Sequence, residues 1–218
     1  LVGAVNGTTM ISNCHVSGSV AGSYQVGGLV GFAQDCTLTI ENSSNNASVT
    51  GSSESDIDNN SRACIGGLVG YINANASVTI SNSTNSGSVG TTSSNDNKGV
   101  GGIVGYAYGS VTLTDCTNSG VVGGKQSVGG IIGYFESTTN ESTTKWLIIN
   151  GATNSGTITG TGEQVGGIVG YANVNSRMFG NMSNTSNITG AGMVGGIAGR
   201  YHGHWCDANT VPVYGSFT

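Results

Sequence analysis

A seven-residue stretch, Val26-Gly27-Gly28-Leu29-Val30-Gly31-Phe32, carries the pattern from which the architecture can be predicted. Copies of it occupy residues 65–71, 100–106, 128–134, 165–171 and 194–200, and Leu1-Val2-Gly3-Ala4 matches the tail of a seventh. With Leu29 as the anchor, the equivalent positions are 1, 29, 68, 103, 131, 168 and 197. The shortest unit is about 28 residues long, and a period of this size is typical of stacked repeat architectures.

A second block follows each anchor. Residues 78–89 match residues 111–122 position by position, and looser copies lie at 15–20, 44–49, 153–158 and 183–188. Each unit thus holds three short β-rich pieces separated by Asn, Ser and Gly, and no window has helical periodicity. We predict an all-β fold: a parallel β-solenoid (β-helix) of about seven coils, with three short strands per coil. The chain is predicted to be a single domain, 1–218, whose last coil, 197–218, is atypical.

Stacked coils turn each repeat position into a column along the axis. Two apolar columns are predicted to fill the interior: Ile11, Ile40, Ile80, Leu113, Ile149 and Phe179, and Val20, Val49, Val89, Val122, Ile158 and Ile188. Two further columns are predicted to form turns: Asn13, Asn42, Asn82, Asp115, Gly151 and Asn181, and Asn45, Asn85, Asn118, Asn154 and Asn184. Asn tolerates a left-handed backbone, and its amide can bond to the next Asn along a stack. The longer units predict loops at 52–63, 91–98 and 137–145.

Composition excludes several classes of protein. The chain has 39 Gly, one Pro, 8% charged residues and a net charge of −5. Collagen needs Gly at every third position and abundant Pro, and a nucleic-acid-binding protein needs a basic patch, so neither fits. No apolar run approaches the roughly 20 residues that span a bilayer, which predicts no membrane insertion. The five Cys form no CxxC pair, and a disulfide between Cys14 and Cys116 is not expected across three coils.

The Gly-Gly-Leu-Val-Gly-Tyr copies resemble the GLUG repeat, named for Gly-Leu-hydrophobic-Gly, of bacterial immunoglobulin A proteases and adhesin-like surface proteins. The resemblance covers nearly the whole chain through six near-complete motifs. It implies an extracellular, β-rich spacer or adhesive module. In those proteases the chemistry lies in a separate metallopeptidase domain, and this chain contains no HExxH motif. The resemblance therefore implies no enzymatic activity and no cofactor.

One aromatic column stands out from the others. It consists of Phe32, Tyr71, Tyr106, Tyr134 and Tyr171. The strand that carries it is apolar on both faces, so one face needs cover from a loop, a neighbouring subunit or a carbohydrate. The column can simply pack on itself, form a lateral interface or stack against sugar rings. A metal site is not expected, and its weak candidates are His202 with His204, and Asp56 with Asp58.

The first coil begins after the position of the paired glycines, and open β edges template further pairing. This predicts self-association, either head to tail into a filament or lateral. Asn-x-Ser/Thr triplets predict a secreted glycoprotein if the source is a eukaryote. The favoured acceptors are Asn59, Asn140, Asn6 and Asn75, whereas Asn42 and Asn82 are expected to be less accessible in their turn column. The function predicted is an extracellular or cell-surface structural or adhesive module; a carbohydrate-binding aromatic surface and a polysaccharide-acting enzyme are the alternatives.

Overall fold

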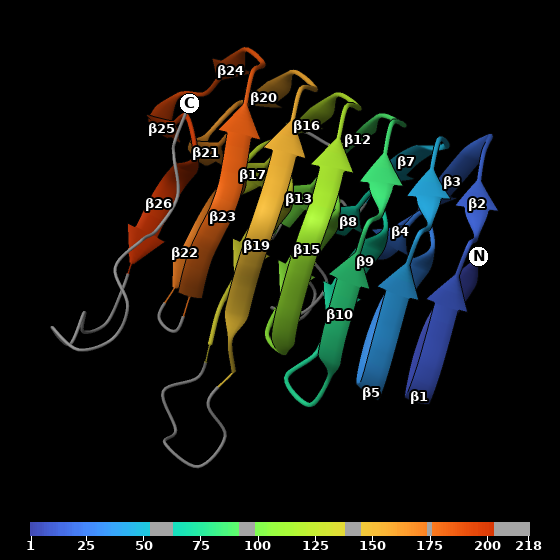
Figure 1. Cartoon of the computed structure of the whole chain (residues 1–218). Helices are drawn as coiled ribbons and strands as arrows, with labels where there is room; N and C mark the ends of the chain where they lie inside the picture. The colour runs from blue at the N-terminus through green and yellow to red at the C-terminus, as the bar shows by residue number, and fades with distance from the viewer. Residues whose placement is uncertain (53–62, 92–98, 138–144, 174–175, 203–218) are drawn as a thin grey trace, which may run out of the picture.

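The computed structural model describes residues 1–52, 63–91, 99–137, 145–173 and 176–202, the side chains of 176–179 and 202 excepted. Every strand in this part of the chain pairs in parallel with its neighbours, and the strands form three sheets that run along a common axis. Figure 1 shows the coils following one another from the N-terminal to the C-terminal end. The predicted parallel β-solenoid is confirmed.

Sheet A has 14 strands and sheets B and C have six each. Sheet A comprises β1 (Val2–Ser12), β2 (His15–Val16), β5 (Val30–Glu41), β6 (Ser44–Asn45), β9 (Val69–Ile72), β10 (Ser77–Ser81), β11 (Thr84–Asn85), β14 (Val104–Ala107), β15 (Ser110–Asn118), β18 (Ile132–Phe135), β19 (Leu147–Asn154), β22 (Val169–Asn173), β23 (Ser176–Asn184) and β26 (Ala198–His202). Sheet B comprises β3 (Ser19–Gly22), β7 (Ser48–Gly51), β12 (Val89–Thr91), β16 (Val122–Gly124), β20 (Ile158–Gly160) and β24 (Ile188–Thr189). Sheet C comprises β4 (Gln25–Gly27), β8 (Cys64–Gly66), β13 (Gly99–Gly101), β17 (Val128–Gly129), β21 (Glu163–Gly166) and β25 (Gly192–Gly195).

The anchors stack as the repeat predicts. The Leu29 amide donates to the Leu68 carbonyl, Leu68 to Ile103, and Ile103 to Ile131, at 2.9–3.0 Å. The three sheets, however, divide the coil differently from the three predicted pieces. Sheet A contains the first two pieces, because β1 and β5 run through both, and the residues just before each glycine pair form sheet C.

The paired glycines are needed where the chain turns sharply from sheet C into sheet A. A Cβ on Gly27 would lie 2.0 Å from the Val30 carbonyl oxygen, and one on Gly28 would lie 2.3 Å from the Gly67 carbonyl oxygen. Neither glycine has a left-handed backbone, so close approach of backbone to backbone requires glycine here. Leu29 and Val30 at the bend are both fully buried in one cluster. In a straight strand, successive side chains would point to opposite faces.

The interior contains two separate apolar clusters. One lies within sheet A and includes Leu29, Val30, Leu38 and Ile40 with their equivalents, and the other lies between sheets B and C and includes Val26 and Val49 with theirs. Gly28 and Asn45 lie between the two clusters, one on each side of the coil, and they contact each other across it. A wall of stacked Gly and Asn therefore divides the interior.

The Asn column that includes Asn45 was predicted to form a turn and to bond along the stack, and the second half of that prediction is confirmed. Asn45, Asn85, Asn118 and Asn154 are fully buried. Each side-chain amide donates to the side-chain oxygen of the next Asn at 2.7–2.8 Å, from Asn45 through to Asn184. Each of the four also donates to the carbonyl two residues ahead at 2.8–2.9 Å.

Two column assignments in the sixth coil were wrong. Met178, not Phe179, pairs with Ile149, and Phe179 pairs with Asn150. The left-handed corner formed by Asn13, Asn42, Asn82, Asp115 and Gly151 is continued by Gly180, not Asn181. Both differences have one cause: the register shifts by a bulge between Asn150 and Ala152, where the sixth coil has one extra residue. The predicted loop residues 53–62, 92–98 and 138–144 lie outside the described part of the chain.

Candidate functional site

The aromatic column forms a ladder of stacked rings on sheet A. Successive ring centroids from Phe32 to Tyr71, Tyr106, Tyr134 and Tyr171 are 5.3, 5.7, 4.6 and 4.4 Å apart. The Tyr106 and Tyr134 rings are nearly parallel, at 5°. The strands hold this arrangement because Phe32, Tyr71, Tyr106, Tyr134 and Tyr171 occupy the same register position in five consecutive coils.

Two side chains that the repeat pattern did not single out cover the middle of the ladder. Tyr108 packs edge-on against Tyr106, with ring centroids 4.9 Å apart. The Glu136 carboxylate accepts hydrogen bonds from the hydroxyls of Tyr106 at 3.1 Å and Tyr134 at 3.4 Å. Tyr106 is only 2% exposed as a result, and the other four rings of the ladder are half-buried.

Arg200 lies at the C-terminal end of the ladder. It takes the Tyr position in the last copy of the motif, and its guanidinium carbon is 5.8 Å from the centre of the Tyr171 ring. The column alignment could have identified this contact, because Arg200 is the residue that breaks the aromatic series. Tyr108 and Glu136 could not have been found in this way, since their shared repeat position, two residues after the ladder ring, holds Gln34, Asn73 and Asn173 in other coils.

The stacking restricts what the ladder can bind. A sugar ring packs on the face of an aromatic ring, and the three rings between Phe32 and Tyr171 each have a neighbouring ring on both sides. The geometry therefore favours the ladder as a packing element that presents ring edges and hydroxyls to its surroundings. Interface formation and sugar stacking at Phe32, Tyr71, Tyr106, Tyr134 and Tyr171 stay predictions.

Burial suppresses ionisation of three phenols of the ladder, those of Tyr71, Tyr106 and Tyr134. Desolvation, with smaller effects of Cys64 and Tyr108, raises the pKa of Tyr71 from its ordinary 10.0 to about 12. Burial also raises the pKa of Tyr106, with further contributions from Tyr108, Glu136 and Tyr134. The pKa of Tyr134 is raised by burial, Glu136 and its neighbouring tyrosines. The hydroxyls are thus neutral hydrogen-bond donors at physiological pH.

We expect the free energy of unfolding to fall as the pH rises from about 10 towards 12. Unfolding releases phenols that ionise near pH 10, whereas the folded ladder keeps them protonated, so the stability from this source is complete below pH 10 and is lost above it. Urea unfolding at a series of pH values measures the effect. Phe32 shows that the column accepts phenylalanine, so the Tyr71→Phe/Tyr106→Phe/Tyr134→Phe variant is the control. An equal alkaline loss of stability in both proteins would contradict the assignment to the ladder.

The comparisons with known proteins give one significant similarity. The chain is similar to part of a halomucin. It is 31% identical over 187 residues to the halomucin of Haloquadratum walsbyi (strain DSM 16790 / HBSQ001). The matched region covers 79% of this chain but only 2% of that protein's length. No protein-family model matches the chain, so the resemblance to the GLUG repeat stays a prediction. No solved structure matches it.

The candidates for metal binding are not placed by the structure. His204, Asp56 and Asp58 lie outside the described residues, and only the backbone of His202, at the end of β26, is described. Within the described ranges, no group of three or more His, Cys, Asp or Glu side chains could hold a metal ion. The same part of the chain has no helix long and apolar enough to cross a membrane.

The predicted glycosylation sites divide into three groups. Asn59 and Asn140 lie outside the described residues. Asn6 and Asn75 are exposed, but their amides are engaged: Asn75 donates to Asp35 at 2.9 Å, and Asn6 donates to the Val5 and Gln34 carbonyls. Asn42 and Asn82 are also exposed, and their lower accessibility relative to the loop acceptors stays a prediction, because Asn59 and Asn140 lie outside the described residues. The left-handed backbone of Asn42 and Asn82, at φ 48° and 47°, forms an outward corner of the coil.

Four described cysteines are free thiols. Cys116 is fully buried, and desolvation raises its pKa from 9.0 to about 12, while Cys14 in the first coil is half-buried. We expect iodoacetamide to label Cys14 in the native protein and to spare Cys116, because alkylation requires an accessible thiolate. Mass spectrometry of peptides from native and urea-unfolded protein measures this. Labelling of both thiols at equal rates in the native protein would contradict the buried position of Cys116.

Proposed function

We propose that this chain is a structural segment of an extracellular or cell-surface protein. The observation that carries the proposal is the continuity of its stacking: backbone pairing, the buried Asn series and the aromatic ladder all run through consecutive coils along one axis. Coils that are joined in this way resist local opening, because opening one coil breaks its ladders on both sides. Stiffness along one axis suits a spacer that bears load or holds other domains at a distance from the cell.

The similarity to a halomucin supports this proposal. Its name classes that protein with the mucins, and a structural segment of a surface protein is consistent with that name. This chain matches a small part of that protein's length, as a spacer or repeat segment would. The surface composition is also consistent with it, because Ser, Thr and Asn replace charged residues along the outer faces of the coils.

Localisation can be tested on the cells that make the protein. Antibodies raised against the folded chain should label intact cells by immunogold electron microscopy, and proteinase K added to intact cells should remove the label. Labelling that appears only after lysis would overturn the proposal. An antibody against a cytoplasmic protein of the same cells is the control for lysis.

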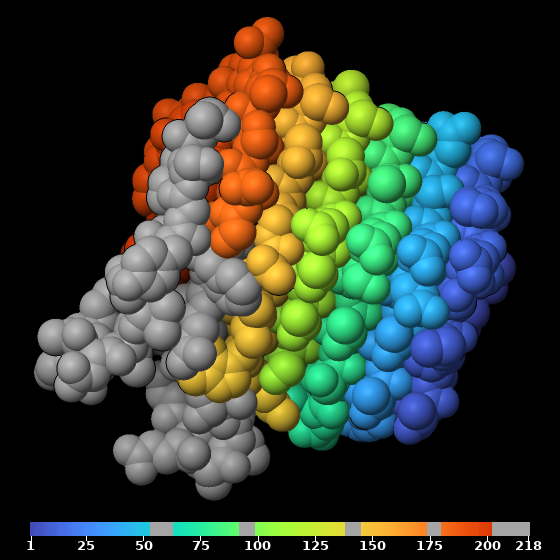
Figure 2. All heavy atoms as spheres, in the orientation of Figure 1, coloured from blue at the N-terminus to red at the C-terminus, as the bar shows by residue number. Residues whose placement is uncertain are grey.

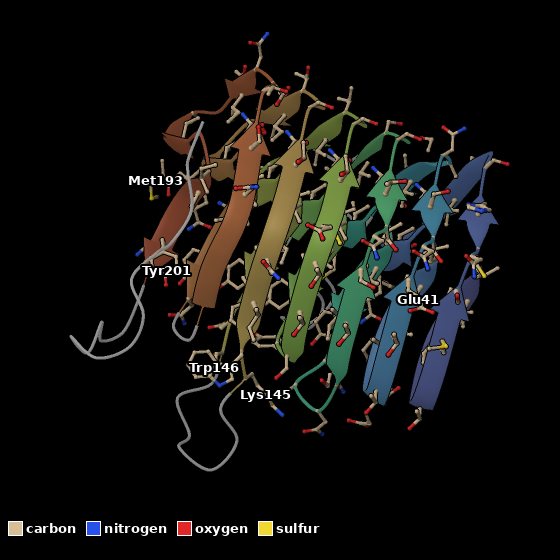
Figure 3. The ribbon with its side chains drawn as sticks, in the orientation of Figure 1. Glu41, Lys145, Trp146, Met193 and Tyr201 are labelled. Carbon is tan, nitrogen blue, oxygen red and sulfur yellow. The ribbon has the colours of Figure 1, made fainter. Side chains whose placement is uncertain are left out.

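Self-association head to tail is a finer proposal. Among the described residues, β3 and β4 are edge strands at one end, and β24 and β25 are edge strands at the other. Exposed apolar side chains lie near both ends: Leu1 and Met10 at the first, and Met193, Val194 and Tyr201 at the second. Met193 and Tyr201 are labelled in Figure 3. Negative-stain electron microscopy of the purified chain should show unbranched filaments; single particles at every concentration would contradict head-to-tail assembly. Adhesion is the other specific role that we propose for a structural segment of this kind.

A further inference from the structure

The outer face of sheet A is a flat array of hydroxyl groups. In coils two to four, the outward residues of β5, β10 and β15 are Thr37, Thr39, Glu41, Ser77, Thr79, Ser81, Ser110, Thr112 and Thr114, which we call the hydroxyl face. The alternating inward residues, such as Leu38, Val78 and Leu113, are at most 1% exposed. Figure 2 shows the coils crossing this side of the molecule as parallel bands.

The hydroxyls of this face are arranged as a lattice. Thr39, Thr79 and Thr112 are in register across three consecutive coils, as are Thr37, Ser77 and Ser110. Neighbouring coils are spaced by about 4.8 Å, and residues two apart on one strand by about 6.7 Å. A flexible surface would lose entropy on ordering, but here the sheet fixes the positions before any ligand arrives.

Most of these hydroxyls are not used by the protein itself. The side-chain hydroxyls of Thr37, Thr39, Ser77, Thr79 and Thr112 make no hydrogen bond to another described residue, while their backbones pair within sheet A. On other faces of the coil the hydroxyls are paired, for example Ser48 with Ser88 at 3.0 Å and Ser44 with His15 at 2.7 Å. The hydroxyl face therefore offers donors and acceptors, now in contact with water, to an external partner.

The chemistry of the face selects the class of partner. Glu41 is its one charged residue, so it has no electrostatic complement to a polyanion or a polycation. A protein partner would require an apolar centre, which the face in coils two to four does not have. What remains complementary is a neutral molecule rich in hydroxyl groups.

The fifth coil adds an apolar platform at the edge of this lattice. Ile148 continues the column of Thr112, and the Trp146 amide donates to the Ser110 hydroxyl at 3.4 Å, which places Trp146 beside the Ser110 column. Trp146 is half-buried at the foot of β19 (Figure 3). An indole beside hydroxyl groups can pack against the apolar face of a sugar ring while the hydroxyls bond to its edge.

From these features we infer that the hydroxyl face binds an extended neutral polysaccharide lying along the solenoid axis. A polysaccharide lying along the axis would cross successive coils about 4.8 Å apart, so the same hydroxyl columns recur along its whole path. This assigns carbohydrate binding to the flat face of sheet A and not to the aromatic ladder. It goes beyond the proposed structural role and does not depend on it.

Affinity electrophoresis of the purified chain tests the inference, with hydroxyethylcellulose as a neutral β-linked polysaccharide and alginate as an anionic one. We expect retardation by hydroxyethylcellulose and not by alginate. The Thr79→Arg/Thr112→Arg variant, which places two long side chains on the face, should bind at least about tenfold more weakly. The matched control is Thr159→Arg/Thr189→Arg, which adds the same charges to exposed, paired positions on sheet B and should change binding by less than about twofold.

Circular dichroism and the urea midpoint show whether each variant is folded. Trp146→Ala is a second variant that adds no bulk and no charge, and it should also weaken retardation. The inference is overturned if the wild-type chain is not retarded by hydroxyethylcellulose, or if the Thr79→Arg/Thr112→Arg variant and Trp146→Ala are both retarded as strongly as the wild type. Surface labelling of cells is a separate measurement, so loss of this inference would leave the structural role standing.

Discussion

Replacing Gly102 by alanine is expected to lower the free energy of unfolding by about 3 kcal/mol or more, or to prevent folding. The added Cβ would lie 2.1 Å from the Gly130 carbonyl oxygen and 2.4 Å from Cγ of Asn118. The first contact is with backbone of the next coil and the second is with a fully buried side chain, so neither can move away cheaply. Urea unfolding followed by circular dichroism measures the change.

Gly123→Ala is the matched control. Its Cβ would have the Thr159 carbonyl oxygen as its nearest neighbour, at 4.0 Å, which is an ordinary contact. We expect a change within about 0.5 kcal/mol, since alanine also restricts the unfolded chain. If the two variants were equally stable, close backbone approach would not be the reason for the paired glycines.

The second large effect is expected from Asn118→Ala, at about 3 kcal/mol. This change leaves the Gly120 carbonyl and the Asn154 side-chain oxygen without the donor that each has at 2.8 and 2.7 Å. It also removes the acceptor of the Asn85 amide. All of these groups are buried, so each one that loses its partner carries a desolvation penalty. Thermal and urea unfolding both measure the loss.

Asn46→Ala is the control, because Asn46 is exposed and accepts one hydrogen bond from Ser86 at 3.1 Å. It should cost less than about 0.5 kcal/mol. A third variant, Asn118→Asp, keeps the shape of the side chain but faces two acceptor oxygens. Burial favours its protonated form, so this variant should lose stability as the pH rises from about 4 to 7. A pH-independent Asn118→Asp variant would show that packing, and not the amide hydrogen bond, stabilises the wall.

Repetition is the reason that so much of the fold could be predicted from the sequence. The same residue types recur at each anchor and column position, so the role predicted for one motif, such as residues 65–71, can be checked against its copies. The interior columns through Ile40 and Val49, the left-handed corner at Asn42 and the series of Asn amides follow from this. The errors at Phe179 and Asn181 arise where the repeat has an extra residue, because a bulge can be placed on either side of a corner without changing the pattern.

The candidate site was predictable only in part, for the opposite reason. The aromatic ladder is itself a column and was identified as one. Tyr108 and Glu136 cover it from one repeat position, two residues after the ladder ring, but that position holds a different kind of side chain in other coils, so no column pattern identified them. The hydroxyl face was not recognised either, because Ser and Thr are so frequent that their alternation in β10 resembles an ordinary solvated strand until the register of neighbouring coils is known.

The buried Asn series has a consequence for how such a protein changes its length. An Asn within the series, such as Asn118, donates to an Asn in one adjoining coil and accepts from an Asn in the other. A coil that is inserted within the series therefore finds an Asn partner on both sides. Duplication or deletion of the gene segment that encodes one coil would thus leave every buried amide bonded. Length is then free to vary between related proteins by whole coils, while a shorter insertion is accommodated in a loop or in a bulge such as the one in the sixth coil.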